Sequence, residues 1–361
     1  MRIAVLGAGN GGQAFAGSLT LSGHDVHLAA VADHDTQIRV LQTFGGVLVE
    51  GKTAEGLEGG FARVARVDTD IIEAVSGNEL IILTVPAYAQ DVYLDTIAQY
   101  APTGSMVLIQ PGKFGALRLV NRLRLIGRDP QELLIGETST FLYAAKMHGL
   151  DRIWLRGVKK ELPLAAWPTS RTAEMLDRLH SVNHQYVHAQ NVLATSIDDA
   201  AYALHPVTTL LNLSRLEVMG PYRTHYYDLT PQVSRMVEAV DHERCQIAQA
   251  FNIHVSSLLE QAKLMYGLEG DSVYEALKKT TVHRDQITPN GAGHRYVTEE
   301  VPYGLVPLLD LAEVAGVKAP AIEAIVTTAS VVNDTDYRLI GRHIDSLGLR
   351  GMSVEKILAT L

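Results

Sequence analysis

A glycine-rich turn at the start of the chain constrains the fold more than any other stretch. Residues 2–6 form an apolar run of the length of a buried strand, and glycines follow at positions 7, 9 and 12. The segment after them is amphipathic, with Phe15, Leu19 and Leu21 on its apolar side. Strand, turn and helix with this G-x-G-x-x-G spacing are typical of a dinucleotide-binding unit.

Each glycine of the turn has its own chemical reason. Gly7 lets the chain leave the strand sharply, Gly9 lets a pyrophosphate approach the backbone, and Gly12 lets the helix pack closely on the strand. The helix N-terminus offers unpaired N–H groups and a partial positive charge to the phosphates. We therefore predict a cofactor-binding loop made of Gly7, Gly9, Asn10, Gly11 and Gly12. The alternative is a structural turn with nothing bound.

Further short apolar runs predict the rest of an α/β domain. They lie at residues 80–85, 106–109 and 133–135. Because helical patterns separate them, they are typical of a doubly wound, mostly parallel sheet. Ligands gather at the carboxyl ends of such strands, so we predict that the turns Val85-Pro86 and Pro111-Gly112 line the cofactor site. A structural role explains each of these turns equally well.

The length of 361 residues, 47% of them hydrophobic, favours two domains over one core. Residues 153–164 look like a hairpin extension. The pattern changes around residues 185–191, and beyond it apolar residues recur at spacings of three and four, as from Val233 to Phe251. We predict a Rossmann domain over residues 1–186 and an all-helical C-terminal domain, carrying the substrate site, over residues 187–361.

Charge and cysteine content exclude several classes of protein. The net charge is −9 and no basic block is long enough to follow phosphates, so nucleic acid is not an expected partner. No apolar run is long enough to span a membrane, and no signal peptide is evident, which favours the cytoplasm. Cys245 is the only cysteine, so neither an intrachain disulfide nor a cysteine-based metal site is expected; we predict no metal.

The second predicted strand spans residues 26–32, and the residues at its end bear on the choice of cofactor. In many NAD-specific folds an acid ends this strand and binds the ribose hydroxyls. That place falls near Ala30, and the acids Asp33 and Asp35 come late. A missing carboxylate, together with Arg39 on the next segment, favours NADP over NAD; Asp33 keeps NAD open.

His205 is the histidine most suited to chemistry. It lies in the apolar segment 200–211, directly before Pro206. Because the residue before a proline is disfavoured in helical geometry, we expect a helix broken there, with the imidazole turned toward a cleft. A core histidine bonded to the backbone is the alternative.

A second candidate cluster spans residues 293–302. Arg295 offers a planar fork suited to a carboxylate. Glu299 or Glu300 could bond one ring nitrogen of a histidine, fixing its tautomer and supporting its protonated form. A solvated charged loop would also explain these residues.

Taken together, these stretches resemble the opine dehydrogenases, in particular the octopine and N-(1-carboxyethyl)-norvaline dehydrogenase group. The likeness covers nearly the whole chain: GAGNGGQAFA, the VPA and QPG turns, IGETST, LHPVTTLLN, RYVTEEVPYGLVPL and NDTDYR. It implies a Rossmann domain joined to a helical domain, with the site in the cleft between them. It also implies NAD(P)H-dependent condensation of an amino acid with an α-keto acid such as pyruvate, through an imine.

By the same resemblance, the catalytic histidine is His205 and the substrate-side arginine is Arg295. The family's acidic partner of the histidine is usually aspartate, and here Glu300 holds that place. We predict that Tyr202 and Thr208 line the amino-acid pocket. Which amino acid and keto acid react is left open, as is a homodimer.

Two rival predictions remain at this stage. One is a simple keto reductase resembling ketopantoate reductase or glycerol-3-phosphate dehydrogenase, which would need a lysine acid; Lys113 is the only candidate. The other is a non-catalytic protein that senses NAD(P).

Overall fold

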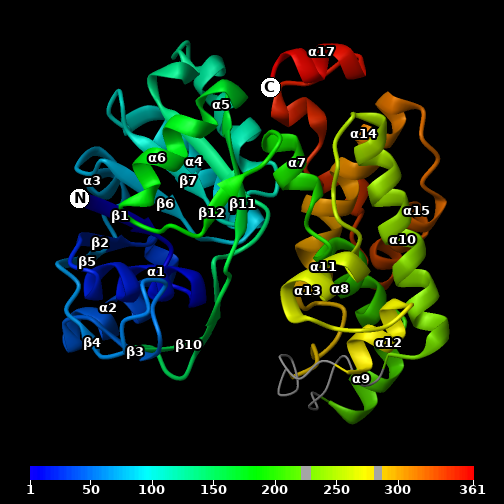
Figure 1. The fold of residues 1–361 in the computed structure, drawn as a ribbon, viewed down its shortest axis with the longest axis horizontal. Helices are drawn as coiled ribbons and strands as arrows, with labels where there is room; N and C mark the ends of the chain where they lie inside the picture. Colours follow the sequence, from blue (N-terminus) through cyan, green and yellow to red (C-terminus); the bar gives the residue numbers. More distant parts are fainter. Residues whose placement is uncertain (221–228, 280–286) are drawn as a thin grey trace. The chain divides into compact units, whose positions relative to one another are not determined.

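The computed structural model describes residues 1–220, 229–279 and 287–361. These residues form two compact units, which we describe separately. The N-terminal unit comprises residues 1–196 together with Leu361, and the helical unit comprises residues 197–360 (Figure 1). The predicted boundary after residue 186 lies ten residues before this division.

The N-terminal unit is built on an eight-stranded sheet with strand order β12-β11-β8-β7-β6-β1-β2-β5. All its strand pairs are parallel except β8 with β11. The strands are β1 (Arg2–Leu6), β2 (Asp25–Ala29), β5 (Arg66–Asp68), β6 (Leu80–Leu83), β7 (Met106–Ile109), β8 (Leu134–Thr138), β11 (Leu162–Trp167) and β12 (Tyr186–His188). The predicted doubly wound, mostly parallel sheet is confirmed.

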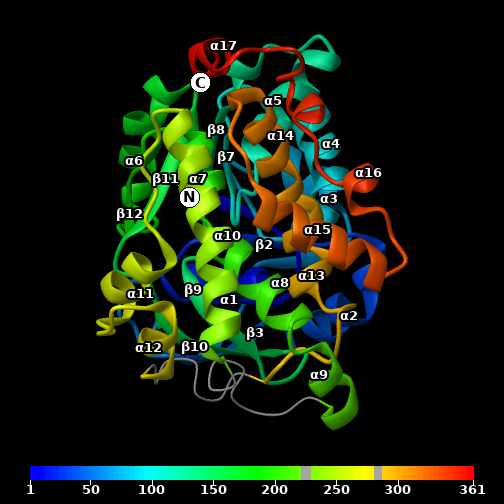
Figure 2. The same ribbon diagram turned by 90° about the vertical axis from the view of Figure 1, so that its right-hand side faces the viewer.

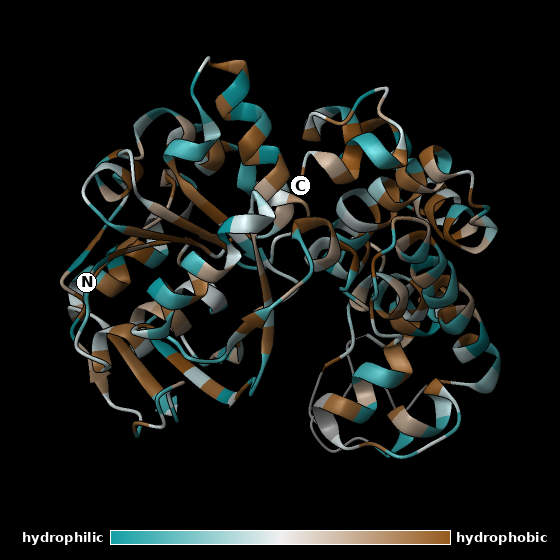
Figure 3. Ribbon diagram, turned by 45° about the horizontal axis from the view of Figure 1, so that its top comes forward, coloured by the Kyte–Doolittle hydropathy of each residue, from teal (hydrophilic) through white to brown (hydrophobic). Residues whose placement is uncertain are grey.

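Helices lie between these strands along the chain, and one more helix follows the last strand. They are α1 (Asn10–Leu21), α2 (Asp35–Phe44), α3 (Ile71–Ser76), α4 (Gln90–Tyr100), α5 (Gly115–Leu125), α6 (Thr172–His180) and α7 (Val192–Ile197), with short 3-10 turns η1 (Ala32–His34), η2 (Ala87–Ala89), η3 (Pro130–Glu132) and η4 (Thr169–Arg171). The residues of β1, β6 and β7 are almost completely buried, which explains why their runs are continuously apolar. Figure 3 shows hydrophobic residues gathered on the strands of this unit.

A second, four-stranded sheet covers α1. It has the order β4-β3-β10-β9 and comprises β3 (Val47–Gly51), β4 (Phe61–Ala62), β9 (Tyr143–Met147) and β10 (Arg152–Val158). Helix α1 contacts strands of both sheets, so residues 12–19 are all buried rather than only one face of the helix. The predicted hairpin over residues 153–164 is wrong, because β10 pairs with β3 and β9 whereas β11 pairs with β8 and β12.

The helical unit contains helices and no strand among its described residues. Its helices are α8 (Ala201–Leu210), α9 (Leu213–Met219), α10 (Pro231–Ala250), α11 (Leu258–Tyr266), α12 (Val273–Lys278), α13 (Arg295–Thr298), the π-helical turn η5 (Val301–Leu305), α14 (Val306–Ala315), α15 (Pro320–Val332), α16 (Tyr337–Ile340), η6 (Ile344–Leu347) and α17 (Val354–Ala359). Helix α8 packs against α10, α13, α15 and η5 (Figure 2).

Candidate active site

The glycine turn leads from β1 into α1 and has the geometry that its spacing predicts. Gly7 has φ +106°, and a Cβ there would lie 2.6 Å from Cγ1 of Val85. A Cβ on Gly12 would lie only 1.6 Å from the carbonyl oxygen of Gly7. The close approach of helix to strand therefore requires glycine at both positions.

Gly9 differs from its neighbours. It is exposed, it precedes α1 without any side-chain cap, and a Cβ built on it would meet nothing within 4 Å. Packing within the chain therefore does not explain this glycine, whereas a ligand that approaches the backbone does. The open space and the uncapped helix N-terminus fit the pyrophosphate of a dinucleotide.

Asn10 and Gly11 also have structural contacts. The Asn10 side-chain oxygen accepts a hydrogen bond of 2.7 Å from the Met147 backbone N–H, which ties β9 to the turn. A Cβ on Gly11 would lie 2.6 Å from the ring of Phe141. The side-chain oxygen of Asn10 is thus already engaged within the chain, and any part of Gly11 in cofactor binding comes from its backbone.

The turns after β6 and β7 adjoin this edge of the sheet. Val85 is buried beside Gly7 and Pro86 is half-buried. Pro111 and Gly112 are buried, and their carbonyl oxygens accept hydrogen bonds from the Gln90 side chain. The strand order places both turns at the carboxyl ends of strands on one side of β1, as predicted.

On the other side of β1, the chain after β2 carries the two charged residues that bear on the choice between NAD and NADP. The strand ends at Ala29, earlier than predicted, and Ala30 is fully buried. Asp33 is exposed in η1, and Arg39 is exposed on α2.

His205 lies within α8, and the predicted break before Pro206 is wrong. The helix continues from Ala201 to Leu210 with the proline inside it. The Thr208 hydroxyl donates to the Leu204 carbonyl at 2.6 Å, and the Thr209 hydroxyl donates to the His205 carbonyl at 2.7 Å. These hydroxyls add hydrogen bonds to the backbone around the proline, where a helix is otherwise weakened.

The His205 imidazole is held by two other segments of the helical unit. Its Nδ1 lies 3.1 Å from Oε1 of Glu300, a carboxylate that is 1% exposed. Its ring stacks on the ring of Tyr296, with centroids 3.8 Å apart and planes 10° from parallel. We call His205, Tyr296 and Glu300 the His205 cluster. A buried carboxylate at Nδ1 fixes the tautomer of the imidazole and can stabilise the imidazolium formed during proton transfer.

Arg295 lies beside this cluster at the start of α13. Its Nε is 3.2 Å from Oε2 of the fully buried Glu299, and its side chain is 43% exposed. The two adjacent acids thus have different partners: Glu299 pairs with Arg295 and Glu300 with His205. The residues alone predicted that either Glu299 or Glu300 would bond a histidine, and Glu300 is the acid that lies beside His205.

Tyr202 and Thr208 are both buried, at 0% and 2% exposure. The ring of Tyr202 packs on Gly304, where a Cβ would lie 2.3 Å from the ring. Their predicted place in an amino-acid pocket stays a prediction, and their burial favours a packing role.

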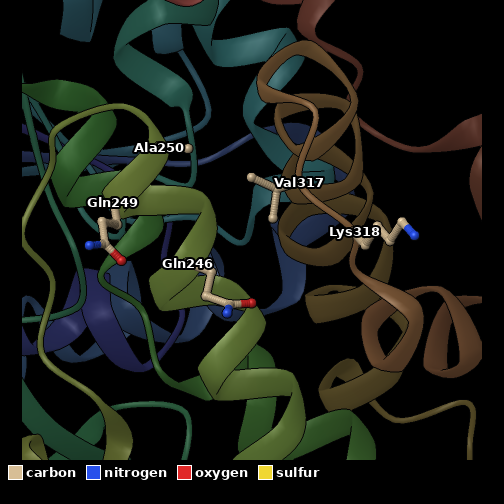
Figure 4. Close-up of a pocket in the computed structure, with 5 residues that line it drawn as sticks. All are labelled: Gln246, Gln249, Ala250, Val317 and Lys318. Atoms are coloured by element: carbon tan, nitrogen blue, oxygen red, sulfur yellow. The ribbon is translucent and has the colours of Figure 1, made fainter.

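A surface pocket of the helical unit is lined by Gln246, Gln249, Ala250, Val317 and Lys318 (Figure 4). It contains none of the predicted site residues. In the described part of the chain, no group of three or more His, Cys, Asp or Glu residues is arranged to hold a metal ion. None of the described helices combines the length and apolar character needed to cross a membrane.

Comparison with known proteins identifies the chain. A family profile described as NAD/NADP octopine/nopaline dehydrogenase, alpha-helical domain, matches residues 188–333. The opine dehydrogenase of Arthrobacter sp. (strain 1C) is 35% identical, over 98% of this chain and 97% of that one. The chain belongs to the opine dehydrogenase family. It is an NAD(P)-dependent oxidoreductase acting on CH–NH, and its reaction is the reductive condensation of an amino acid with a 2-oxo acid.

The family fold extends over the whole chain. A profile described as NADP oxidoreductase coenzyme F420-dependent matches residues 2–108. The structure of octopine dehydrogenase with NADH and L-arginine superposes with a TM-score of 0.81 at 20% identity, covering 99% of this chain and 98% of that one. Yersinopine dehydrogenase with NADP⁺ bound gives a TM-score of 0.73 at 17% identity, covering 99% and 97%. The relatives do not favour the simple keto reductase or the non-catalytic sensor.

This opine dehydrogenase also has a buried carboxylate in the stretch that follows the predicted strand at residues 133–135. Glu137, at the end of β8, is fully buried and accepts hydrogen bonds from the Ala116 backbone N–H and the hydroxyls of Thr195 and Ser196. Its carboxylate therefore binds the N-terminal turn of α5, whereas no side chain caps the N-terminus of α1. The signal in the sequence was only its position in the turn after a predicted strand.

Lys113, the lysine that the rival reductase would need, is 2% exposed and has φ +48°. It directly precedes Phe114, which also has a positive φ and leads into α5. The lysine thus belongs to a tight, buried turn of the N-terminal unit.

Proposed function

We propose that His205 is the general acid/base of this opine dehydrogenase, that Glu300 orients it, and that Arg295 binds a substrate carboxylate. The observation that supports this proposal best is the contact of 3.1 Å between a partly exposed imidazole and a buried carboxylate. With Nδ1 facing Glu300, Nε2 is the ring nitrogen left for the substrate.

The proposed chemistry follows from these positions. The amino group attacks the keto carbon, and protonated His205 gives its proton to the keto oxygen to form a hydroxyl. The imidazole then takes a proton from the attached nitrogen and gives it to the hydroxyl, which leaves as water as the protonated imine forms. The reduced nicotinamide supplies a hydride to the imine carbon when it is bound. Arg295 holds a carboxylate of the substrates by charge-assisted hydrogen bonds, which orients the reacting carbon.

A substrate-dependence assay tests this function. Oxidation of NAD(P)H is followed with pyruvate alone, with an amino acid alone and with both, and the product is analysed by mass spectrometry. We expect consumption of NAD(P)H to require both substrates and to yield a secondary amine that carries two carboxylates. Equal rates with pyruvate alone, giving a 2-hydroxy acid, would contradict the proposal. Screening amino acids against 2-oxo acids then identifies the preferred pair.

For the cofactor we propose a preference for NADPH over NADH. It is supported by the buried Ala30 directly after β2 and by the exposed Arg39 on α2, since no acid stands at the strand end to repel a 2′-phosphate. Arg39→Ala should lower kcat/KM for NADPH by about 10-fold and leave NADH little changed, since one charge-assisted hydrogen bond has this magnitude. A preference for NADH that Asp33→Ser abolishes would overturn the proposal.

A homodimer and a cytoplasmic location complete the proposal. Light scattering of the purified protein tests the first, and fractionation of the producing cells tests the second.

A further inference from the structure

Tyr296 contacts two imidazoles of the helical unit. One face of its ring stacks on His205 with a centroid distance of 3.8 Å, and His294 meets the same ring edge-on at 4.5 Å and 81°. The tyrosine is 9% exposed. A ring this deeply buried is held by its surroundings and can in turn hold a neighbour.

The backbone of Tyr296 is also fixed. His294 precedes the short helix α13, and its Nδ1 accepts a hydrogen bond of 3.2 Å from the Tyr296 N–H. One imidazole therefore anchors the tyrosine at its backbone, and the other lies against its ring.

The two histidines differ in what their Nδ1 atoms face. Nδ1 of His205 faces a carboxylate, which is an acceptor only, so this nitrogen carries a proton. Nδ1 of His294 faces an N–H donor and must be unprotonated. Burial, aided by the charges of Arg295 and His205, lowers the pKa of His294. Of the two imidazoles, His205 is thus the one suited to proton transfer.

The contact with Glu300 alone does not fix the His205 ring. A single hydrogen bond sets a distance and leaves the imidazole free to tilt about the line that joins Nδ1 to Oε1, since the terminal torsion of histidine is soft. Stacking within 10° of parallel removes this freedom. Because Nε2 lies across the ring from Nδ1, the stack also determines where Nε2 points.

We propose that Tyr296 is a positioning residue that holds the plane of the His205 imidazole by ring stacking, so that Nδ1 meets Glu300 and Nε2 is aimed at the substrate. The inference rests on the proposed role of His205. It assigns a function to the aromatic ring of Tyr296, independently of the tyrosine hydroxyl.

Three variants test this proposal: Tyr296→Phe keeps the ring, Tyr296→Leu removes it, and Tyr274→Leu removes an aromatic ring elsewhere in the helical unit. We expect Tyr296→Leu to lower kcat roughly 10-fold, in line with the strength of one aromatic pair, with KM for both substrates and the affinity for NAD(P)H within about 2-fold. Tyr296→Phe and Tyr274→Leu should stay within about 2-fold of wild type in kcat.

Several results would overturn the proposal. Tyr296→Leu with wild-type kcat would show that the stack has no positioning effect, and a loss in Tyr296→Phe equal to that in Tyr296→Leu would assign the effect to the hydroxyl. If Tyr296→Leu does not fold, a loss of kcat in Tyr296→Phe would still overturn the proposal, because that variant keeps the ring.

Measuring His205→Asn in parallel separates this inference from the proposed function. Loss of activity in His205→Asn with none in Tyr296→Leu refutes the positioning role alone. Wild-type activity in His205→Asn refutes both.

Discussion

The glycine turn and the His205 cluster are encoded in the chain in different ways. The turn is one contiguous stretch, residues 7–12, and its geometry depends on backbone conformation and on the absence of Cβ atoms at Gly7 and Gly12. The His205 cluster joins residues 95 positions apart in sequence, and its geometry depends on a hydrogen bond and a ring stack between side chains.

This difference shows that the two sites have different structural requirements. A backbone site can be substituted freely except where an added atom collides, so its requirements can be assigned glycine by glycine. A side-chain cluster is functional only when separate helices place the groups to within a few tenths of an ångström. The following predictions separate these two kinds of requirement.

Replacing His205 with asparagine should have the largest effect. Asparagine is polar and small enough to fit but cannot transfer a proton near neutral pH, so kcat should fall by about 1000-fold, the typical contribution of a general acid/base. The dissociation constant of NAD(P)H, measured by fluorescence titration, should change less than 2-fold because the glycine turn belongs to the N-terminal unit. His242→Asn, an exposed histidine on α10, serves as the control. Turnover near that of wild type would contradict the assignment.

Two alanine substitutions in the glycine turn should have opposite signatures. Gly12→Ala places a Cβ 1.6 Å from the Gly7 carbonyl oxygen, so we expect a loss of roughly 3 kcal/mol in the free energy of unfolding. Gly9→Ala meets no protein atom; stability should stay within about 1 kcal/mol, while the affinity for NAD(P)H falls roughly 10-fold because the Cβ enters the pyrophosphate's space. Urea unfolding without cofactor and a binding titration measure the two effects. Normal binding by Gly9→Ala would show that the open space has another use.

Glu300 tests whether charge or length matters in the His205 cluster. Glu300→Gln keeps the size and removes the charge, so kcat should fall roughly 100-fold while the fold is retained. Glu300→Asp, the residue that the family resemblance leads one to expect, keeps the charge but withdraws the carboxylate from Nδ1, and a loss of about 10-fold is expected. A wild-type rate in Glu300→Gln would mean that His205 needs only a hydrogen-bond acceptor. Steady-state kinetics with saturating substrates distinguishes these outcomes.

The sequence predicts local features of the fold well. The strand at residues 106–109 has the predicted bounds, because four consecutive aliphatic residues between turns have few other uses in a parallel sheet. The prediction of a hairpin over residues 153–164 was wrong. Alternation shows that a segment is a strand but not which strand it pairs with, and β10 and β11 belong to different sheets.

The site shows the same limit. Pro206 indicated a broken helix, but hydroxyls of Thr208 and Thr209 bond the backbone beside it, and nothing in the proline's own neighbourhood required that outcome. The pairing of His205 with Glu300 came from a family resemblance rather than from spacing. The stack on Tyr296 was not foreseen, because a tyrosine beside an arginine carries no signal for a histidine in a distant segment.

A pH-dependent effect on stability is expected at the beginning of the helical unit, where Asp198 lies near the fully buried Arg244. Burial raises the pKa of Asp198 from 3.8 to about 6, although Arg244 acts in the opposite direction. A folded-state pKa above the unfolded one means that the folded state binds more protons, so this group lowers the stability as pH rises from about 4 to about 6. Asp198→Asn cannot ionise, so its stability relative to wild type should increase over that range. We expect a gain of up to roughly 3 kcal/mol, the free energy that a rise of the pKa from 3.8 to about 6 represents, since the opposing effect of Arg244 is already contained in that rise.

The two units can be observed separately in this experiment, because the chain has two tryptophans, Trp154 and Trp167, and both belong to the N-terminal unit. Tryptophan fluorescence therefore follows the unfolding of that unit, whereas circular dichroism of the helices also follows the helical unit. If the units unfold independently, Asp198→Asn should shift the urea midpoint by circular dichroism at pH 7 and leave it unchanged at pH 4, with no shift in fluorescence at either pH. A difference between variant and wild type that is constant across pH would show that Asp198 does not titrate in this range. Equal shifts in both signals would show that the units unfold cooperatively, so that a stability change in either one, Gly12→Ala included, is felt by the whole protein.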